Sequence, residues 1–194
     1  LLSRRQRQMC IRDSTGTLCE KAGQVTSVEL SKRRAQINYY RNEKKDNLTI
    51  MVGNLNDMDL GQQYDYVVVN GVLEYAMSFT EGDTPYETFL GKMGSYLKNT
   101  GKLLIAIENK LGMKYFAGAP EDHTDIPFFG INGYPENHSV RTFSKTELQE
   151  LVKKSGFPFQ KFYYPYPDYK FPTEIFTDAS LTTNPVSYTH LTLP

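Results

Sequence analysis

Three near-continuous apolar runs stand out in the first half of the chain. They cover residues 25–30, 48–52 and 64–70. Runs of this length, rich in Val, Ile and Leu and without strict alternation of polar positions, predict strands that are buried on both faces, as in a parallel sheet.

The segments around these runs carry helical signals. Residues 15–23 have the pattern of the second half of a helix that stops at a glycine, and Ser31 is a cap for a helix that runs to about Lys45. Residues 73–79 predict a further short helix. Strands and helices therefore alternate along the chain.

The clearest helix start lies at Thr84. Pro85 suits the first helical position, and Glu87 completes a capping box with Thr84. Apolar side chains then recur at helical spacing as far as Leu97. Another apolar run predicts a strand over residues 102–108.

The last third of the chain is less regular. Residues 109–141 show little periodicity, and a loop of this length inside a compact domain is usually functional or disordered. A second capping box at Ser144 and Glu147 starts a helix. Residues 157–176 are aromatic and rich in proline, which predicts edge strands. The whole order indicates an α/β fold with a mostly parallel sheet and antiparallel C-terminal strands.

Both ends of the chain resemble translated sequencing adapter. Residues 4–14 and 186–194 can be back-translated into the two strands of a transposase adapter. Segments of this kind are excluded from fold reasoning. We therefore expect residues 1–14 and 186–194 to be artefacts, and residues 15–185 to be part of a domain cut from a longer gene.

Removal of these ends changes the charge balance. The chain has 22 basic and 22 acidic residues, and the end segments hold four arginines and one aspartate. The remaining 18 basic and 21 acidic residues leave no basic stripe that would suit nucleic acid.

The cysteines and the length of the apolar runs indicate in which cellular compartment the protein works. Cys19 is the only cysteine outside the adapter-like ends, so the natural segment has neither a disulfide framework nor a thiol metal site. No apolar run is long enough to span a bilayer. We expect a cytoplasmic protein.

Polar side chains close the first three predicted strands. They are Glu29, Asn54 and Asn70. Ligands of open α/β sheets bind outside the carboxyl ends of the strands, where an acid can accept hydrogen bonds from ribose hydroxyls. An amide such as that of Asn54 can bond an adenine edge. We expect the three side chains to converge on one nucleoside-sized site. The alternatives are a solvated acid at position 29 and plain turn chemistry at Gly53-Asn54.

In their order and spacing these segments resemble the class I S-adenosylmethionine-dependent methyltransferases. Residues 28–30 resemble the ribose-binding strand end and residues 52–55 the adenine-contacting turn. Residues 64–75 resemble the strand beside the methyl donor, and residues 100–109 the next strand after its glycine turn. The resemblance implies a Rossmann-like fold and S-adenosyl-L-methionine as the cofactor.

The same resemblance implies which residues hold the cofactor. Glu29 and Leu30 would contact the ribose. Gly53, Asn54 and Leu55 would contact the adenine. Asn70 and Gly71 would lie beside the methyl donor. An aspartate is commoner in the family at the position of Asn54.

A larger departure lies before Thr15. The family's first strand and glycine-rich loop should stand there, but the adapter-like segment occupies their place. That loop presents backbone N–H groups to the amino-acid end of the cofactor. We therefore expect the chain as given to bind the cofactor weakly or not at all and to be inactive; micromolar binding by calorimetry would contradict this.

Methyl transfer to oxygen needs positioning of the reactants and a base within reach of the acceptor. His123 is our first candidate for that base, and Glu108 and His138 are further candidates; a structural role for His123 is the alternative. Asp122, His123 and His138 have no spacing typical of a metal site, so we predict none.

Residues 108–118 also resemble a bacterial subgroup that often accompanies glycosyltransferases of cell-surface polysaccharide synthesis. This likeness implies a saccharide or other small acceptor, and it allows for glycosyltransferase domains fused in the parent protein.

Two other functions stay open. One is a nicotinamide-dependent oxidoreductase or sugar-nucleotide enzyme on a related sheet, and the other is a non-catalytic Rossmann-like binding domain. An antiparallel C-terminal strand pair would favour the methyltransferase. Tyr166 and Lys170 have the spacing of short-chain dehydrogenases, but we interpret it as accidental because it falls in a proline-rich run.

Overall fold

A computed structural model describes residues 14–136, 139–170 and 172–183. Almost all of the predicted N-terminal artefact and all of the predicted C-terminal one lie outside these ranges, so both interpretations stay predictions. The chain divides into two compact units, Leu1–Gly61 and Gln62–Pro194, which are described one at a time.

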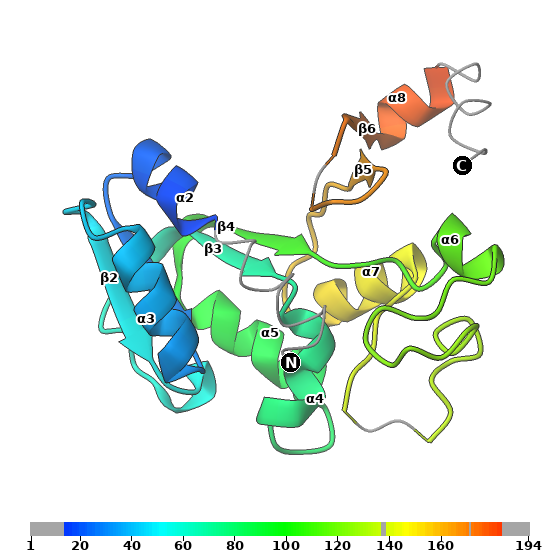
Figure 1. The fold of residues 1–194 in the computed structure, drawn as a ribbon, viewed down its shortest axis with the longest axis horizontal. Coiled ribbons are helices and arrows are strands. Elements are labelled where there is room, and N and C mark those ends of the chain that lie inside the picture. The colour runs from blue at the N-terminus through cyan, green and yellow to red at the C-terminus, as the bar shows by residue number, and fades with distance from the viewer. Residues whose placement is uncertain (1–13, 137–138, 171, 184–194) are drawn as a thin grey trace. The chain divides into compact units, whose positions relative to one another are not determined.

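The first unit is built around one strand–helix–strand motif. After α2 (Thr15–Lys21), strand β1 (Val25–Glu29) leads through α3 (Lys32–Arg41) to β2 (Leu48–Val52), and the two strands pair in parallel (Figure 1). A single turn of 3-10 helix, η1 (Leu55–Asp57), follows β2. The predicted parallel pairing is confirmed here.

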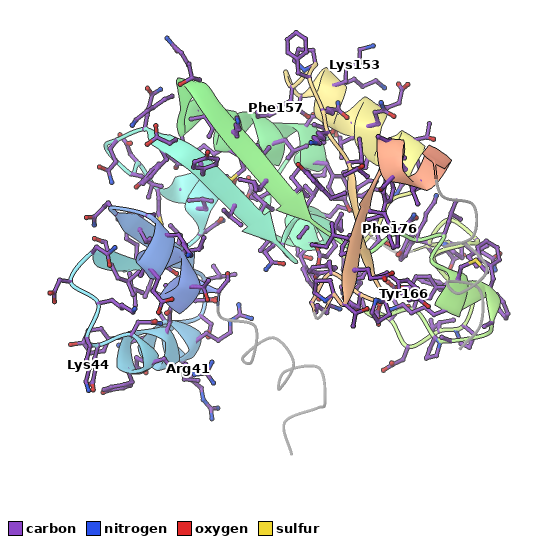
Figure 2. All side chains as sticks on the ribbon, turned by 90° about the horizontal axis from the view of Figure 1, so that it is seen from above. Arg41, Lys44, Lys153, Phe157, Tyr166 and Phe176 are labelled. Atoms are coloured by element: carbon purple, nitrogen blue, oxygen red, sulfur yellow. The ribbon has the colours of Figure 1, made fainter. Side chains whose placement is uncertain are left out.

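Helix α3 begins where predicted and ends earlier. The hydroxyl of Ser31 accepts a hydrogen bond from the backbone of Arg34, which confirms the cap. The predicted extension to Lys45 is wrong, because the side-chain amide of Asn42 donates to the carbonyl of Asn38 and the backbone turns there. Arg41 and Lys44 mark this exposed end (Figure 2).

The second unit begins with another parallel pair. Strand β3 (Tyr64–Asn70) leads through η2 (Leu73–Tyr75), α4 (Ala76–Phe79) and α5 (Pro85–Ser95) to β4 (Leu97–Ala106). The core of this unit lies on η2, α4 and α5, where fully buried side chains include Leu73 of η2 and Phe89, Leu90 and Met93 of α5.

The strands of this pair are not buried on both faces, so that prediction is wrong. Val69 is 3% exposed, whereas Tyr66 and Val68 are 60% and 46% exposed. Successive side chains of a strand point to opposite faces. Helix α5 packs against one face of the pair, and Leu104 of β4 is exposed on the other with Val68, its register partner.

Helix α5 differs from the prediction at both ends. Pro85 does take the first helical position, but in the part of the chain that the structure describes the Thr84 side chain makes no capping bond, because its ψ of 63° is not the extended value of a cap. The helix stops at Ser95. The carbonyl of Tyr96 accepts a hydrogen bond from the backbone of Tyr64, so Leu97 begins β4 instead of ending the helix.

Beyond β4 the chain runs through a long irregular segment that holds α6 (Met113–Phe116) and reaches α7 (Lys145–Lys154) (Figure 1). Strands β5 (Tyr163–Tyr166) and β6 (Glu174–Thr177) then form an antiparallel hairpin, as predicted, before α8 (Asp178–Thr183). Figure 2 marks the hairpin by Tyr166 and Phe176.

The start of α7 confirms the second capping box. The backbone of Ser144 donates to Oε2 of Glu147 at 2.8 Å, and the backbone of Glu147 donates to the Ser144 hydroxyl at 3.3 Å. Oε1 of Glu147 pairs with Nζ of Lys110 at 2.7 Å. Partial burial opposes ionisation of Glu147, but Lys110 and the bonds with Ser144 outweigh it and lower its pKa to about 2.

This box gives a pH-dependent stability prediction. Because the folded-state pKa of Glu147 is depressed, its stabilisation is complete above the ordinary carboxyl pKa and is lost as the pH falls from about 4.5 to about 2. We expect Glu147→Gln to lower the free energy of unfolding by about 1 kcal/mol at pH 7 and by almost nothing at pH 2. Chemical denaturation at several pH values measures this, with the exposed Glu150→Gln on the same helix as control. Equal losses at both pH values would contradict the ion-pair account.

The described part of the chain has the predicted mixed α/β architecture, with parallel strand pairs joined through helices and an antiparallel C-terminal hairpin. Within the same residues, no helix combines the length and the apolar character needed to cross a bilayer.

Candidate active site

The carboxyl ends of β1 and β2 bring one group of predicted cofactor residues together. Glu29 lies opposite Val52 in the parallel register, and the backbone N–H of Gly53 donates to the Glu29 carbonyl at 3.1 Å. Asn54 and Leu55 follow directly. Leu30 extends beyond β1 and is 59% exposed. All five predicted residues therefore lie at one edge of this strand pair.

The carboxylate of Glu29 has structural partners that sequence reasoning did not identify. Its Oε1 accepts hydrogen bonds from the backbone of Ser31 at 2.9 Å and from Nε and Nη2 of Arg34 at 2.9 and 2.6 Å. These contacts hold the side chain across the start of α3. All of them use Oε1, and among the described residues Oε2 has no hydrogen-bond partner.

The turn after β2 is held by Asn54. Its side-chain oxygen accepts a hydrogen bond from the backbone of Asn56 at 3.1 Å and thereby caps η1. The turn interpretation of Gly53-Asn54 is thus confirmed. The capping bond thereby fixes the orientation of the amide.

The second unit places the other predicted cofactor residues at the end of β3. Asn70 is exposed opposite Ala106 of β4, and the backbone of Gly71 donates to the Ala106 carbonyl at 2.9 Å. Gly71 has a φ of 63°, in the left-handed region that favours glycine. A Cβ at this position would lie 3.2 Å from the hydroxyl of Tyr169 and 3.5 Å from Oε1 of Glu74.

Substitution of Gly71 is therefore expected to be costly. Gly71→Ala should lower the free energy of unfolding by about 1 kcal/mol or more, because it adds backbone strain and a close contact. Gly91→Ala is the matched control: Gly91 lies inside α5 with nothing within 4 Å of a built Cβ, and alanine should stabilise the helix. Thermal unfolding of both variants measures the difference, and a neutral Gly71→Ala would contradict the account.

A buried group of polar side chains lies close to Gly71, just beyond β4. We call it the acid–histidine cluster, and it consists of Glu74, Tyr75, Glu108, His123 and Lys170. Glu74 and Tyr75 belong to η2, and Glu108 lies two residues beyond the end of β4. His123 lies in the irregular segment, and Lys170 lies in the loop between β5 and β6. The structure thus brings the two predicted base candidates, Glu108 and His123, into one site.

Glu108 is the centre of this cluster. Its side chain is 7% exposed; Oε1 forms an ion pair with Nζ of Lys170, and Oε2 lies 3.6 Å from Nε2 of His123. On the other side of the imidazole, Nδ1 lies 2.8 Å from the hydroxyl of Tyr75, whose ring meets the imidazole edge to face. The imidazole is therefore held from both sides.

The ionisation of the cluster is shifted by its burial and its charges. Burial raises the pKa of Glu74 to about 7, and the charge of Glu108 adds to this. Burial also acts to raise the pKa of Glu108, but His123 and Lys170 outweigh it and lower that pKa to about 2. Burial acts to lower the pKa of His123, whereas the carboxylates of Glu108 and Glu121 raise it above its ordinary value.

Glu121 holds the irregular segment around His123. It is 2% exposed, and its Oε2 accepts bonds from the backbones of His123 and Thr124, both at 2.8 Å, and from the Thr124 hydroxyl at 3.0 Å. Its Oε1 accepts from the hydroxyl of Tyr134 at 3.2 Å. One buried carboxylate therefore fixes the backbone that carries the imidazole.

Sequence reasoning missed three members of the cluster. Glu74 and Tyr75 lie in η2, four and five residues after the end of β3, and an acid so soon after a predicted strand end was an available signal. Lys170 stood in the Tyr-x-x-x-Lys match that was interpreted as accidental; the structure directs its ammonium to Glu108. His138 lies outside the described residues, so its candidacy stays a prediction.

Comparison with known proteins gives matches at the level of structure alone. No protein-family model matches the chain, and no curated protein sequence matches it. An N-methyltransferase, NodS from Bradyrhizobium japonicum, superposes with a TM-score of 0.54 at 12% identity over 79% of this chain and 70% of its own. An S-adenosylmethionine-dependent methyltransferase from Clostridium acetobutylicum gives 0.52 at 12% identity over 73% and 67%.

A protein assigned as an O-methyltransferase from Nostoc punctiforme gives 0.51 at 14% identity over 74% of this chain. The chain has their Rossmann-like fold. It spans about two fifths of the length of the Nostoc protein, namely 41%. The structural likeness at this identity concerns the fold, and the chemistry must be argued from the residues of the site.

Proposed function

We propose that the chain is part of an S-adenosyl-L-methionine-dependent methyltransferase of the cytoplasm that acts on an oxygen atom. The observation that carries this proposal is the position of polar residues at the carboxyl ends of the parallel strands, in a fold that is shared with methyltransferases. The antiparallel β5–β6 hairpin supports it further against a nicotinamide-dependent enzyme.

The residues at the strand ends suit the proposed cofactor. Oε2 of Glu29 is available for ribose hydroxyls while Oε1 is held by Arg34, and the capped turn at Asn54 and Leu55 would receive the adenine. Asn70 and Gly71 would lie beside the methyl donor. When bound, S-adenosyl-L-methionine supplies a methyl group on a sulfonium centre.

The acid–histidine cluster supplies a group for the acceptor. An acceptor hydroxyl must lose its proton as its oxygen is methylated, and Nε2 of His123 is the atom that we propose accepts it. Glu108, 3.6 Å away, would stabilise the imidazolium, and the Tyr75 hydroxyl at Nδ1 would keep the ring oriented. The raised pKa of His123 strengthens the imidazole as a base.

The acceptor that we propose is a saccharide or a similar small hydroxylated molecule. The support is the likeness of residues 108–118 to methyltransferases that accompany glycosyltransferases of cell-surface polysaccharide synthesis, with glycosyltransferase domains as proposed neighbours in the parent protein. Glu108 and α6 both belong to this stretch.

The test uses the uninterrupted gene product that contains residues 15–185. It is incubated with cofactor labelled with tritium on the methyl group and with a panel of saccharides, and calorimetry compares S-adenosylhomocysteine with NADH. We expect transfer of label to a saccharide hydroxyl and binding of S-adenosylhomocysteine alone. Binding of NADH without S-adenosylhomocysteine would overturn the proposal in favour of the oxidoreductase.

A further inference from the structure

Three ligand-type atoms face one another inside the acid–histidine cluster. They are carboxylate oxygens of Glu74 and Glu108 and a ring nitrogen of His123, and all of them lie within 4.8 Å of one another. Each comes from a different segment: η2, the extension of β4 and the irregular segment. No spacing in the sequence could have indicated this set.

Both carboxyl groups hold a buried oxygen that has no hydrogen-bond donor among the described residues. Glu74 is 1% exposed and Glu108 is 8% exposed, and among the described residues Oε2 of each carboxylate accepts no hydrogen bond. Buried carboxylate oxygens are normally satisfied, because an unmet one costs the desolvation of a charged group. An unmet pair beside an imidazole therefore points to a missing partner with positive charge.

The charge inside the cluster leads to the same partner. Glu74, Glu108 and Glu121 are buried carboxylates close to the imidazole, and Lys170 is the one ammonium that pairs with them in the described chain. When Glu74 is ionised and the imidazole is neutral, these three carboxylates carry two more negative charges than the ammonium of Lys170 balances, and a divalent cation would offset them.

We propose that Glu74, Glu108 and His123 form a three-ligand site for a first-row divalent cation such as Mn²⁺ or Zn²⁺. Two carboxylates and one imidazole suit these ions better than Mg²⁺ or Ca²⁺, which prefer oxygen alone. Metal–ligand bonds of about 2.0–2.2 Å would draw the three atoms closer together by rotation of side chains.

The surrounding residues act on the ligands. The hydroxyl of Tyr75 fixes the imidazole at Nδ1 and leaves Nε2 toward Glu108. Lys170 binds the other oxygen of Glu108, which orients the carboxylate but also places a positive charge near the cation. Such outer contacts alter metal affinity about 10–100-fold. Tyr75 should therefore favour metal binding, whereas the charge of Lys170 should weaken it.

A cation here would deepen the proposed function without depending on it. A metal would lower the pKa of an acceptor hydroxyl bound to it, so that the proton could pass to solvent and His123 would serve as a ligand instead of as the base. Metal binding itself needs no methyl transfer. The binding experiment and the labelling experiment can therefore fail separately.

The experiment uses the metal-free chain. MnCl₂ is added and the unbound ion is followed by electron paramagnetic resonance, with ZnCl₂ as a competitor. We expect one Mn²⁺ per chain, displaced by Zn²⁺, and a loss of affinity of about tenfold or more in Glu74→Gln. Glu150→Gln, an exposed acid of α7, is the control and should bind as the unaltered chain does.

A second variant keeps the test sharp if Glu74→Gln fails to fold. Lys170→Met removes the competing charge and should tighten Mn²⁺ binding severalfold. The proposal is overturned if no stoichiometric binding occurs, if a folded Glu74→Gln binds as well as the unaltered chain, or if Lys170→Met leaves the affinity unchanged. In those cases Glu74 is a buried acid that carries a proton.

Discussion

Replacement of Glu29 by glutamine is expected to weaken binding of S-adenosylhomocysteine by about tenfold or more in the uninterrupted gene product. A carboxylate accepts stronger hydrogen bonds from ribose hydroxyls than an amide does, by about 1.5 kcal/mol or more. Titration calorimetry measures the change. Since Oε2 of Glu29 is the unoccupied acceptor at the carboxyl edge of β1, this is the largest effect expected in the first unit.

The structure also defines the control, because Glu29 has a second role at the start of α3. Arg34→Gln removes the ion pair to Oε1 and keeps the carboxylate. If Glu29 contacts ribose directly, Arg34→Gln should change the affinity far less than Glu29→Gln. Equal losses in the two variants would mean that the acid only supports the helix, and the ribose assignment would fail.

Loss of the Glu108 carboxylate should strongly destabilise the second unit. Glu108→Leu leaves the ammonium of Lys170, whose side chain is 10% exposed, with Asp168 at 3.8 Å as its remaining ion-pair partner among the described residues. Removal of one partner of a buried ion pair costs about 3–5 kcal/mol. We expect a fall in the melting temperature of about 6–20 °C, measured by calorimetry with a chelator present so that metal binding does not contribute.

Restoring the balance of charge should recover most of this loss. The double variant Glu108→Leu with Lys170→Met replaces the pair by apolar side chains and should be far more stable than Glu108→Leu alone. The exposed pair of Lys98 and Asp65 is the matched control, and Asp65→Asn should have little effect. Additive losses in the double variant would show that Glu108 and Lys170 are not coupled.

Local patterns explain which elements could be predicted. Strands β2 and β3 lie where apolar runs placed them, and the box at Ser144 formed because its two bonds depend on residues three positions apart. The end of α5 could not be predicted in this way. The carbonyl of Tyr96 bonds to Tyr64, a residue more than thirty positions earlier, and that contact decides where β4 begins.

In the candidate site, too, local sequence patterns predicted some residues, whereas long-range contacts could not be predicted. Polar residues after apolar runs indicated Glu29, Asn54 and Asn70; Glu29 and Asn70 are the last residues of β1 and β3, and Asn54 lies two residues beyond β2. Their predicted convergence on one nucleoside stays a prediction. Lys170 pairs with Glu108, which lies 62 positions earlier in the sequence. Lys170 follows a proline-rich run without periodicity, so the sequence pattern could not predict this contact.

The most direct test of the central claim is a crystal structure of the uninterrupted gene product with S-adenosylhomocysteine. The claim is that the carboxyl ends of β1, β2 and β3 hold one nucleoside. It predicts ribose hydroxyls on the Glu29 carboxylate, adenine beside Asn54 and Leu55, and the sulfur that carries the methyl group in the cofactor near Asn70 and Gly71. A ligand whose ribose lies away from Glu29, or that spans none of these strand ends, would contradict it.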